Sequence, residues 1–412
     1  MKYRIIAPQH IENCTIDLPP SKSIANRALV ISALCGLDSA SLNLQSDYLC
    51  DDIKAVKELI SQDGNVVDVS SAGTGMRFGL AFLSVKEGKR ILTGSESLCR
   101  RPIKELVDAL VCLGADVKYV GREGYPPLEI MGNPLMKGGE VSVLGDISSQ
   151  FVSALLMIAP KMEKGLLLHL FGSVVSRPYI DMTIGLMKQF GASIEWVDEN
   201  TLKVDSGYCV DKSELDGFRL EADWSSASYL YEIMALSGSG DIEIKGLSDE
   251  SMQGDKVGKH LFEMLAEMEK ESDSTSNHNK PFSYDFSSCP DLVQTMAVAC
   301  CGMDIPFCFT GVKTLKIKET DRLEALKNEL EKFGFEIEIS ADTISWNGMH
   351  TDGKCGNCVV ETYSDHRMAM AFAPLALKFG EILIDSPEVV SKSFPHYWDV
   401  LRCIGFEIKE EP

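Results

Sequence analysis

Apolar residues recur at helical spacing in several segments, and each of these segments ends at a glycine that precedes a short alternating pattern. The pattern is clearest in LVDALVCLGADVKYV, LMKQFGASIEWV, LKNELEKFGFEIEI and VLRCIGFEIKE, whose glycines are Gly114, Gly191, Gly334 and Gly405. Glycine readily takes the left-handed conformation that ends a helix, and alternation of apolar and polar residues is typical of a half-buried strand. The sequence therefore predicts a helix, a glycine stop and a strand at each place.

These segments recur at intervals of about 70 residues or twice that distance. A further copy is expected around residues 261–271, and a weaker first copy around residues 56–69. Helix–glycine–strand segments are common in any α/β protein, but the regular interval favours about six repeats of one unit. Units of this length indicate a duplicated α/β architecture rather than a thin solenoid. The polar segment EKESDSTSNHNKP, residues 269–281, is predicted to be an exposed loop.

Composition and charge narrow the class of protein. The chain has 412 residues, of which 45% are hydrophobic and 25% charged, and this favours two globular domains. The formal net charge of −21 argues against nucleic acid or an anionic membrane as the main partner. The longest apolar run, near residues 151–160, is too short to cross a bilayer. The N-terminal residues lack the apolar core and cleavage site of a signal peptide, so we expect a cytoplasmic protein.

The 13 cysteines are scattered without the spacing of a disulfide framework, which favours reduced thiols. Cys355 and Cys358 form the one close pair, and His350 lies nearby. A zinc site needs about four ligands, and no second pair follows. A turn with two ordinary thiols is therefore favoured over a metal or redox site.

Basic residues gather at the expected starts of several helices. The helix macrodipole places partial positive charge there, so lysine and arginine are poorly placed unless an anion lies between them. Free N–H groups and Ser or Thr hydroxyls at helix starts bind such anions. The basic residues concerned are Lys22, Arg27, Arg100, Arg101, Arg177, Lys316, Lys318, Arg322, Arg367 and Lys392. Basic residues also fall at helix starts by chance, but their repetition in an acidic chain favours a bound anionic small molecule, such as a phosphorylated one.

Familiar phosphate motifs do not explain this pattern. The segment SAGTGMR, residues 71–77, lacks the lysine of a P-loop, and there is no G-x-G-x-x-G motif. Asp291, Glu319 and His366 are titratable residues beside the basic helix starts. Taken singly, Asp291 and Glu319 are each better explained as a helix cap or a first-turn acid.

A set of motifs together resembles the 5-enolpyruvylshikimate-3-phosphate synthase family, in order from about residue 19 to 400. They are PPSKSIANRAL, SAGTGMR, RRPIKELVDAL, GDISSQFVSALL, SRPYIDMT, EADWSSASY, KETDRL, SDHRMAMAFA and SKSFPHYW. The resemblance implies an α/β fold of two similar domains, each made of three repeated units (an inside-out α/β barrel), with the active site in the cleft between them. It implies one domain over residues 19–219, mainly on the shikimate 3-phosphate side, and another over residues 1–18 and 220–412.

The resemblance also implies an enzyme of the shikimate pathway, which leads to chorismate and the aromatic amino acids. Its members transfer the enolpyruvyl group of phosphoenolpyruvate to the 5-hydroxyl of shikimate 3-phosphate and release phosphate. They need no metal and no organic cofactor, and they are mostly monomers.

Carried over by motif, the residues that hold shikimate 3-phosphate are Lys22, Ser23, Arg27, Ser148, Ser149, Gln150, Ser176, Asp291 and Lys318. Those that hold phosphoenolpyruvate are Lys22, Gly73, Arg101, Gln150, Arg322, Arg367 and Lys392. Asp291 is then the base for the 5-hydroxyl, and Glu319 protonates the methylene carbon of phosphoenolpyruvate. Lys22 lies near the leaving phosphate.

The sequence departs from the family pattern in places. Ser71, Phe78 and Thr314 stand where the family usually has asparagine, proline and asparagine. The segment near residues 63–71 is shorter than usual, so a strand pair of one repeat is expected to be missing. These departures bear on phosphoenolpyruvate affinity and herbicide response, whereas the acid, the base and most cations are in place.

Two rival functions follow from the same scaffold. A transferase acting on UDP-N-acetylglucosamine has Lys-Asn where this chain has Lys22-Ser23, and it uses a loop cysteine. Cys99 lies near the corresponding region, but Arg101 and the SKS and DHR motifs favour shikimate 3-phosphate. A catalytically dead anion-binding protein is the rival from another class, and the presence of both Asp291 and Glu319 argues against it.

Overall fold

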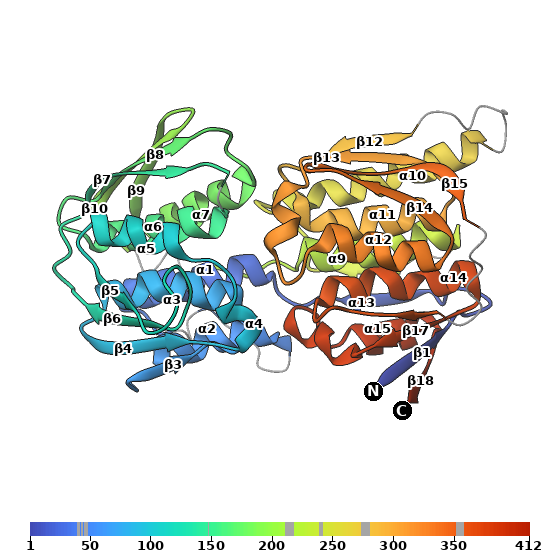
Figure 1. Ribbon diagram of the computed structural model, residues 1–412, viewed down its shortest axis with the longest axis horizontal. Coiled ribbons are helices and arrows are strands. Elements are labelled where there is room, and N and C mark those ends of the chain that lie inside the picture. The colour runs from blue at the N-terminus through green and yellow to red at the C-terminus, as the bar shows by residue number, and fades with distance from the viewer. Residues whose placement is uncertain are drawn as a thin grey trace. The chain divides into compact units, whose positions relative to one another are not determined.

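Two compact units make up the chain in the computed structural model (Figure 1). The structure describes residues 1–38, 42, 44, 48–146, 148–210, 218–238, 242–272, 281–351 and 358–412. Residues Pro20–Leu220 form one unit, here called the continuous unit. Residues Met1–Pro19 and Glu221–Pro412 form the other, here called the split unit.

The continuous unit consists of helices and two mixed sheets. Its helices are α1 (Lys22–Leu34), α2 (Asp51–Ser61), α3 (Gly73–Val85), α4 (Glu96–Cys99), α5 (Lys104–Cys112), α6 (Ser149–Ile158) and α7 (Arg177–Gln189), with the 3-10 helix η3 (Ala159–Lys161). Its strands are β3 (Val66–Asp68), β4 (Gly88–Thr93), β5 (Asp116–Tyr119), β6 (Leu128–Gly132), β7 (Gly139–Leu144), β8 (Leu166–Phe171), β9 (Ala192–Asp198) and β10 (Thr201–Tyr208).

The split unit repeats this kind of organisation. Its helices are α9 (Trp224–Ser237), α10 (Val257–Ser272), α11 (Val293–Gly302), α12 (Arg322–Lys332), α13 (His366–Phe372), α14 (Ala376–Phe379) and α15 (Tyr397–Ile404), with the 3-10 helices η4 (Gly254–Lys256), η5 (Pro290–Leu292), η6 (Lys313–Ile317), η7 (Ala373–Leu375) and η8 (Pro387–Lys392). Its strands are β1 (Lys2–Ile6), β2 (Cys14–Asp17), β11 (Ile242–Lys245), β12 (Phe282–Asp285), β13 (Phe307–Thr310), β14 (Phe335–Ile339), β15 (Thr343–His350), β16 (Val359–Val360), β17 (Glu381–Asp385) and β18 (Glu407–Glu411).

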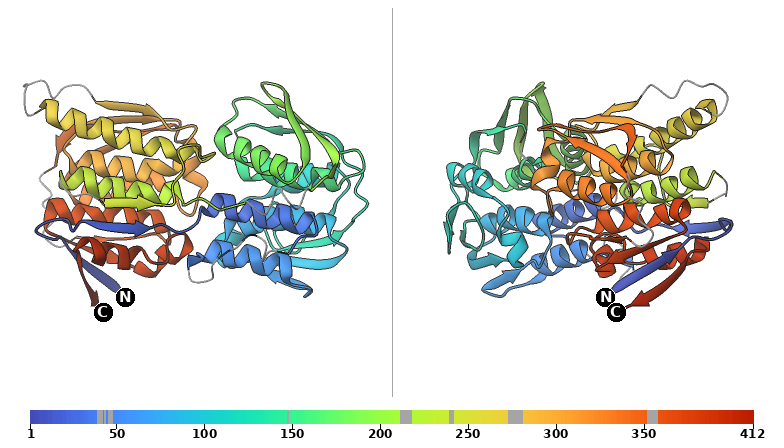
Figure 2. Two further views of the ribbon diagram at one scale, coloured as in Figure 1. Left: turned by 180° about the vertical axis from the view of Figure 1, so that it is seen from behind. Right: turned by 45° about the vertical axis from the view of Figure 1, so that its right-hand side comes forward.

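One sheet topology recurs in both units. The strand orders are β3-β4-β6-β5, β7-β8-β10-β9, β12-β13-β15-β14 and β16-β17-β1-β18. In each sheet the first two strands are parallel and the remaining pairs are antiparallel. In the last sheet the N-terminal strand β1 lies between β17 and β18, so the two ends of the chain lie side by side (Figures 1 and 2). This recurrence confirms a repeated α/β unit.

The glycine stops of the sequence pattern are present in the structure. Gly114, Gly191, Gly334 and Gly405 have φ angles of 104°, 75°, 90° and 110°. Each follows a helix (α5, α7, α12 or α15) and precedes a strand (β5, β9, β14 or β18). Only a residue without a Cβ takes such angles freely, which explains why glycine ends each of these helices. The four predicted glycine stops are therefore confirmed.

Two other predictions concern residues 56–69 and residues 269–281. The weaker copy at residues 56–69 is confirmed, because it contains the end of α2 followed by β3, which is the first strand of the next sheet. Residues 62–65 separate them and contain no strand, in agreement with the missing strand pair. The loop predicted for residues 269–281 is wrong at its beginning, because α10 continues through Ser272 on good helix formers. Residues 273–280 lie outside the described part of the chain.

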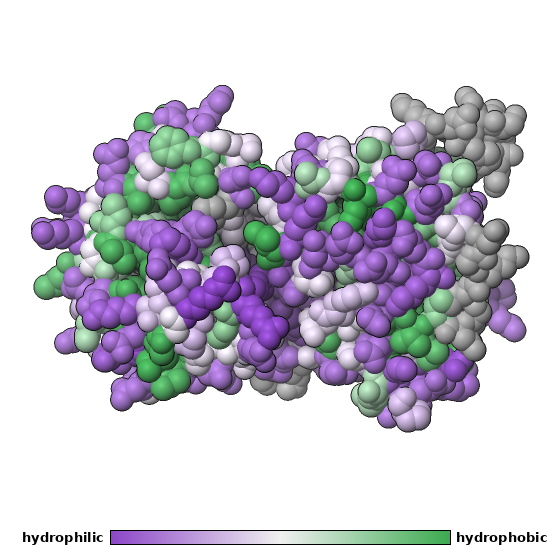
Figure 3. Space-filling view, in the orientation of Figure 1, coloured by the Kyte–Doolittle hydropathy of each residue, from purple (hydrophilic) through white to green (hydrophobic). Residues whose placement is uncertain are grey.

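The centre of each unit is made of helices that are buried on most sides. Every residue of α3, α11 and α13 is buried, and α1, α6 and α9 are buried along most of their length. Helices that are apolar all round belong in a core, whereas α2 and α15 keep a polar face. On the face shown in Figure 3, apolar residues are scattered among hydrophilic ones.

The oxidation state of the cysteines differs at one residue from the prediction of reduced thiols. Cys358 is disulfide-bonded, so the prediction is wrong at this residue, and Cys355 lies outside the described residues. The other described cysteines are free thiols. Within the described ranges, no group of three or more His, Cys, Asp or Glu side chains is arranged to hold a metal ion. None of the helices in those ranges combines the length and apolar character that a membrane span needs.

A buried carboxyl group on α9, that of Glu232, is expected to lower the stability of the protein at neutral pH. Glu232 is 0% exposed, and neither of its oxygens has a hydrogen-bond partner among the described residues. Burial raises the pKa of Glu232 well above its ordinary value of 4.5. The folded state therefore binds more protons than the unfolded state above that pH, and the free energy of unfolding falls as pH rises.

We expect Glu232→Met to increase the free energy of unfolding at pH 8 by about 1–3 kcal/mol, because it removes a buried polar group without a partner. The gain should shrink as the pH falls toward and below 4.5, because the carboxyl then becomes protonated in the unfolded state as well as in the folded state. Chemical denaturation between pH 5 and pH 8 measures the effect, with exposed Glu267→Met as the matched control. Equal stability of the wild type and Glu232→Met at pH 8 would contradict this prediction.

Candidate active site

Predicted ligand-binding residues stand at the starts of the central helices of the continuous unit. Lys22 is the first residue of α1, and Gly73 is the first residue of α3. Ser148 caps α6, and its hydroxyl accepts a hydrogen bond from Gln150 N at 3.3 Å. Gln150 Nε2 in turn donates to Thr74 Oγ1 at 3.3 Å, which joins the starts of α6 and α3. The starts of α1, α3 and α6, where backbone N–H groups have no partner within the helix, therefore all belong to one unit.

Lys22 and Ser176 each have a distinctive local setting. The Lys22 ammonium lies 3.4 Å from the carboxylate of Asp52, which is a buried residue of α2. Sequence reasoning missed Asp52, although the Asp-Asp pair that opens α2 was a visible signal. Ser176 precedes α7 with a φ of 54°, a left-handed conformation that is rare for a residue other than glycine. Such strain is often kept at functional positions.

Arg27 is more deeply buried than its predicted role suggested. Its side chain donates to Thr183 Oγ1 at 2.7 Å, to Ser23 O at 2.9 Å and to Ser153 Oγ at 3.1 Å. Burial lowers the pKa of Arg27 to about 10. Arg27 thus joins α1 to α6 and α7, whatever else it binds.

The guanidinium groups of Arg77 and Arg101 lie close to Gly73 at the start of α3. A Cβ built on Gly73 would lie 2.9 Å from Nη1 of Arg77 and 2.9 Å from Nη1 of Arg101. Arg77 Nη1 donates to Gly73 O at 3.0 Å. Arg77 belongs to the SAGTGMR motif but had no predicted role, and the structure places it beside the predicted residues Gly73 and Arg101. Glycine at this position leaves room for both cations.

The split unit contains a compact network of charges around Arg322. This guanidinium is 2% exposed and donates from Nη1 to Asp291 Oδ1 at 3.0 Å and from Nη2 to Glu319 Oε2 at 2.9 Å. It also donates from Nε to Asp365 Oδ2 at 2.7 Å. Burial lowers the pKa of Arg322, but the carboxylates of Asp365, Glu319 and Asp291 outweigh burial and hold that pKa above its ordinary value. Arg322 therefore joins the predicted acid to the predicted base.

Two further cations complete this network. Arg367 Nη2 donates to Asp291 Oδ2 at 2.8 Å, and Arg367 Nη1 donates to the backbone oxygen of Asp291 at 3.2 Å. Lys392 Nζ donates to Glu319 Oε1 at 3.0 Å. Asp365 caps α13 by accepting from Arg367 N at 2.9 Å. Asp365 lies in the SDHR motif, but sequence reasoning did not assign it a role.

The predicted ligand-binding and catalytic residues are divided between the two units. Within the continuous unit lie Lys22, Ser23, Arg27, Gly73, Arg101, Ser148, Ser149, Gln150 and Ser176. Within the split unit lie Asp291, Lys318, Glu319, Arg322, Arg367 and Lys392. Lys318 is half-buried directly after η6 and directly before Glu319. Asp291 does lie in the first turn of η5, as the alternative of a first-turn acid expected. The carboxylates of Asp291 and Glu319 also bind basic groups of other elements, which a capping role alone does not explain.

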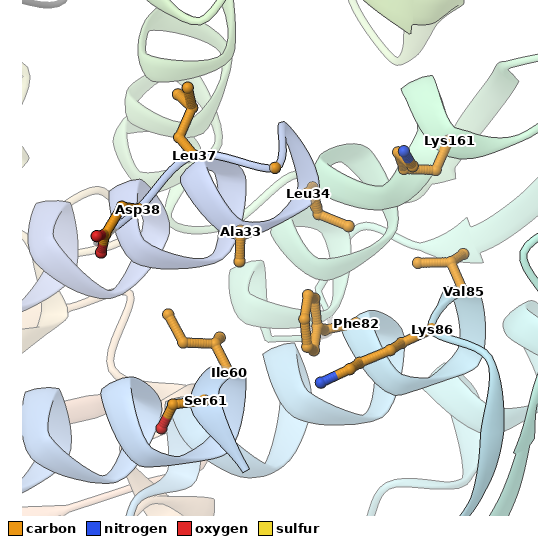
Figure 4. A pocket seen from close by; sticks show the side chains of 11 residues that line it. Ala33, Leu34, Leu37, Asp38, Ile60, Ser61, Phe82, Val85, Lys86 and Lys161 are labelled. Carbon is orange, nitrogen blue, oxygen red and sulfur yellow. The ribbon is translucent and has the colours of Figure 1, made fainter. Parts of the chain in front are cut away.

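A cavity of about 480 Å³ in the continuous unit lies away from these helix starts. It is lined by Ala33, Leu34, Gly36, Leu37, Asp38, Ile60, Ser61, Phe82, Val85, Lys86 and Lys161 (Figure 4). Those residues lie at or just beyond the C-terminal ends of α1, α2, α3 and η3, where helices carry partial negative charge. The cavity is therefore separate from the predicted anion site.

Comparison with known proteins agrees with the motifs. The family model described as EPSP synthase (3-phosphoshikimate 1-carboxyvinyltransferase) matches residues 37–401. A 3-phosphoshikimate 1-carboxyvinyltransferase of Bacteroides fragilis is 46% identical over 99% of this chain and 99% of its own length. One from Photobacterium profundum is 36% identical over 94% of this chain and 96% of its own length.

Solved structures support the fold. An EPSP synthase from Acinetobacter baumannii has a TM-score of 0.72 at 18% identity, covering 100% of each chain. The enolpyruvyl transferase NikO from Streptomyces tendae has a TM-score of 0.66 at 13% identity, covering 99% of this chain and 98% of its own. At such identities the likeness concerns the fold alone. The family match and the curated relatives cover nearly the whole chain, and the chain therefore belongs to the EPSP synthase (3-phosphoshikimate 1-carboxyvinyltransferase) family.

Proposed function

We propose that this protein transfers the enolpyruvyl group of phosphoenolpyruvate to the 5-hydroxyl of shikimate 3-phosphate and releases phosphate. The observation that carries the proposal is the network in which Arg322 binds both Asp291 and Glu319. Arg367 also binds Asp291, and Lys392 also binds Glu319. An acid and a base held beside cations suit a reaction between two anionic substrates. The family membership of the chain supports the same chemistry.

Shikimate 3-phosphate would be held mainly by helix starts of the continuous unit. Its phosphate would bind the hydroxyls and N–H groups of Ser148, Ser149 and Ser176, together with Lys318 of the split unit. Ser23 and Arg27 would contact the same substrate, and Gln150 would lie between the two ligands. In this proposal the chain has two domains of three repeats each, one over residues 19–219 and the other over residues 1–18 with 220–412.

Phosphoenolpyruvate would be held by Lys22, Gly73, Arg101, Gln150, Arg322, Arg367 and Lys392. The last three cations bind Asp291 or Glu319. The substrate would therefore share these cations with the acid and the base, which brings the reacting carbon close to both carboxyl groups. Fixed cations also reduce the repulsion between two substrates of like charge.

The chemical steps follow from these positions. The protonated Glu319 carboxyl donates its proton to the methylene carbon of phosphoenolpyruvate, which leaves positive charge on the adjacent carbon. The 5-hydroxyl oxygen attacks that carbon while Asp291 removes the hydroxyl proton. The carbon–oxygen bond to phosphate then breaks, with the Lys22 ammonium near the leaving phosphate. Glu319 takes back a proton from the new methyl group, which restores the double bond.

Phosphate release with shikimate 3-phosphate and phosphoenolpyruvate, without added metal, tests the function directly. We expect release only when both substrates are present. Release with UDP-N-acetylglucosamine in place of shikimate 3-phosphate would instead support the related transferase. Binding of substrate by folded protein without release would support a catalytically dead scaffold.

We further propose that the protein acts in the cytoplasm as a monomer, without a metal or an organic cofactor. The acidic net charge of −21 supports small-molecule substrates over nucleic acid or membrane partners. Sedimentation of the purified protein tests the oligomeric state. A stable dimer at micromolar concentration would contradict the monomer.

Gly73→Ala is expected to raise the KM for phosphoenolpyruvate by roughly 10- to 100-fold, because small displacements of substrate-binding groups are costly. The added Cβ would lie 2.9 Å from the guanidinium nitrogens of Arg77 and Arg101, whose flexible side chains would have to shift. Affinity for shikimate 3-phosphate should change little. Gly64→Ala is the matched control, because its nearest atom would lie at 3.7 Å. An unchanged KM in a folded Gly73→Ala protein would contradict the proposed position of Arg101.

A further inference from the structure

The segment that joins β16 to α13 is attached to helix α12 at two places. At the end of this segment, Asp365 accepts hydrogen bonds from Arg322, the first residue of α12, at 2.7 Å from Nε and at 3.4 Å from Nη2. Nearer its beginning, the segment is bound by Glu329, which lies about two turns further along the same helix. Arg322 and Glu329 therefore lie on one face of α12, about 10 Å apart along its axis.

Glu329 is a buried carboxylate, 0% exposed, that binds both a side chain and the backbone of this segment. Its Oε1 accepts a hydrogen bond from the hydroxyl of Tyr363 at 2.8 Å, and its Oε2 accepts one from Glu361 N at 3.1 Å. The ammonium of Lys332 balances the buried charge by donating to Oε1 at 2.8 Å and to Oε2 at 2.6 Å. The same ammonium donates to Val359 O at 3.0 Å. Neither Glu329 nor Tyr363 had a predicted role.

The backbone between the two attachments has an unfavourable conformation. Tyr363 and Ser364 have φ angles of 53° and 56°, which are rare for residues other than glycine. Such conformations persist only where the surrounding structure holds them. Asp365 N donates to Thr362 O at 2.8 Å, which closes a tight turn over this strained pair. The bond from Tyr363 to Glu329 holds the turn on one side, and the bonds from Arg322 to Asp365 hold it on the other.

The position of Asp365 in turn orients two cations that are proposed to bind phosphoenolpyruvate. Asp365 Oδ1 accepts from Arg367 N at 2.9 Å, so the carboxylate caps the helix that carries Arg367. The guanidinium of Arg322 is bound by both oxygens of Asp365. Glu329 is thus connected to both cations through the backbone of residues 361–365.

We propose that Glu329 is a positioning residue for phosphoenolpyruvate binding, and that it acts through Tyr363 on Asp365. When the bond to Tyr363 is lost, the strained turn relaxes and the Asp365 carboxylate moves. Arg322 and Arg367 then lose their fixed direction, and small displacements of substrate-binding groups are costly. The inference rests on the proposed function, because it takes phosphoenolpyruvate as the anion that these cations bind.

Tyr363→Phe tests the proposal by removing one hydroxyl while keeping the ring. We expect the KM for phosphoenolpyruvate to rise by roughly 5- to 50-fold, in line with the cost of a small misplacement, whereas kcat should fall by less. The Kd for shikimate 3-phosphate alone should change little. Steady-state phosphate release gives the two kinetic constants, and calorimetry gives the Kd.

Tyr208→Phe is the matched control. It removes a hydroxyl that donates to Met157 O at 2.7 Å in the continuous unit, so it loses a hydrogen bond of similar length. It should have a similar loss of stability but keep the KM of the wild type.

Glu329→Gln tests the attachment from the other side, and it keeps the inference testable if Tyr363→Phe does not fold. The amide has a single oxygen, so it does not accept from both Tyr363 and Glu361, and the KM for phosphoenolpyruvate should rise at least as much. Both variants break one attachment, so the double variant should have about the KM of Glu329→Gln alone. Glu338→Gln makes the same change at an exposed position of β14 and should keep the KM of the wild type.

The possible results separate the inference from the function. A wild-type KM for phosphoenolpyruvate in folded, active Tyr363→Phe and Glu329→Gln overturns the role of Glu329 and leaves the transferase intact. An equal rise in Tyr208→Phe also overturns it, because loss of stability alone would then explain the effect. A wild type that releases no phosphate from the two substrates overturns the proposed function, and the inference with it. A rise confined to the Glu329 and Tyr363 variants, with unchanged affinity for shikimate 3-phosphate, supports the inference.

Discussion

Asp291→Asn is expected to lower kcat by roughly 10²–10⁴-fold, the range that a positioned general base contributes. The amide keeps the size of the carboxyl group but does not accept the proton of the 5-hydroxyl. The native carboxylate is oriented by hydrogen bonds from Arg322 at 3.0 Å and from Arg367 at 2.8 Å. Steady-state phosphate release measures the loss.

The same variant should keep its fold and most of its affinity for shikimate 3-phosphate. Circular dichroism and calorimetry with this substrate alone check both points. Asp249→Asn is the matched control, because it makes the same change at an exposed position of the split unit. Near-normal kcat in a folded Asp291→Asn protein would show that another group removes the hydroxyl proton.

Arg322→Met is expected to destabilise the protein by about 3–5 kcal/mol, the usual cost of removing one partner from a buried ion pair. The guanidinium is bonded to three carboxylates from η5, the segment before α12 and the residue before α13. Without it these carboxylates repel one another in a mostly buried region where water screens them weakly. Activity should be lost as well, since the acid and the base lose their common cation.

Arg322→Lys keeps the positive charge but not the planar set of donors, so a single ammonium group does not satisfy three carboxylates at once. We expect a smaller loss of stability than in Arg322→Met and a large rise in the KM for phosphoenolpyruvate. Arg402→Met is the control, since Arg402 is exposed and bonds one exposed carboxylate, a pair worth at most about 1 kcal/mol. Denaturation curves that coincide for Arg322→Met and Arg402→Met would contradict this account.

Much of the local structure was predictable because it depends on neighbouring residues. The stops at Gly114, Gly191, Gly334 and Gly405 follow from the freedom of glycine to adopt positive φ, and the strands after them follow from alternation. The loop at residues 269–281 was wrong at its start because the composition of a polar segment does not reveal where a helix ends. The family was predicted correctly from motifs, since these preserve the residues at the helix starts.

The sequence alone determined the repeated helix and strand units, the gathering of cations at helix starts and the family of the protein. Each of these is a property of a short segment or of a set of short segments. Only the tertiary structure decided that β1 completes the sheet of β17 and β18, and that Arg322 binds Asp291, Glu319 and Asp365 together. It alone revealed the burial of Arg27, Glu232 and Glu329. The reason is physical: burial and ion pairing depend on how segments far apart in the chain pack, and no single segment contains that information.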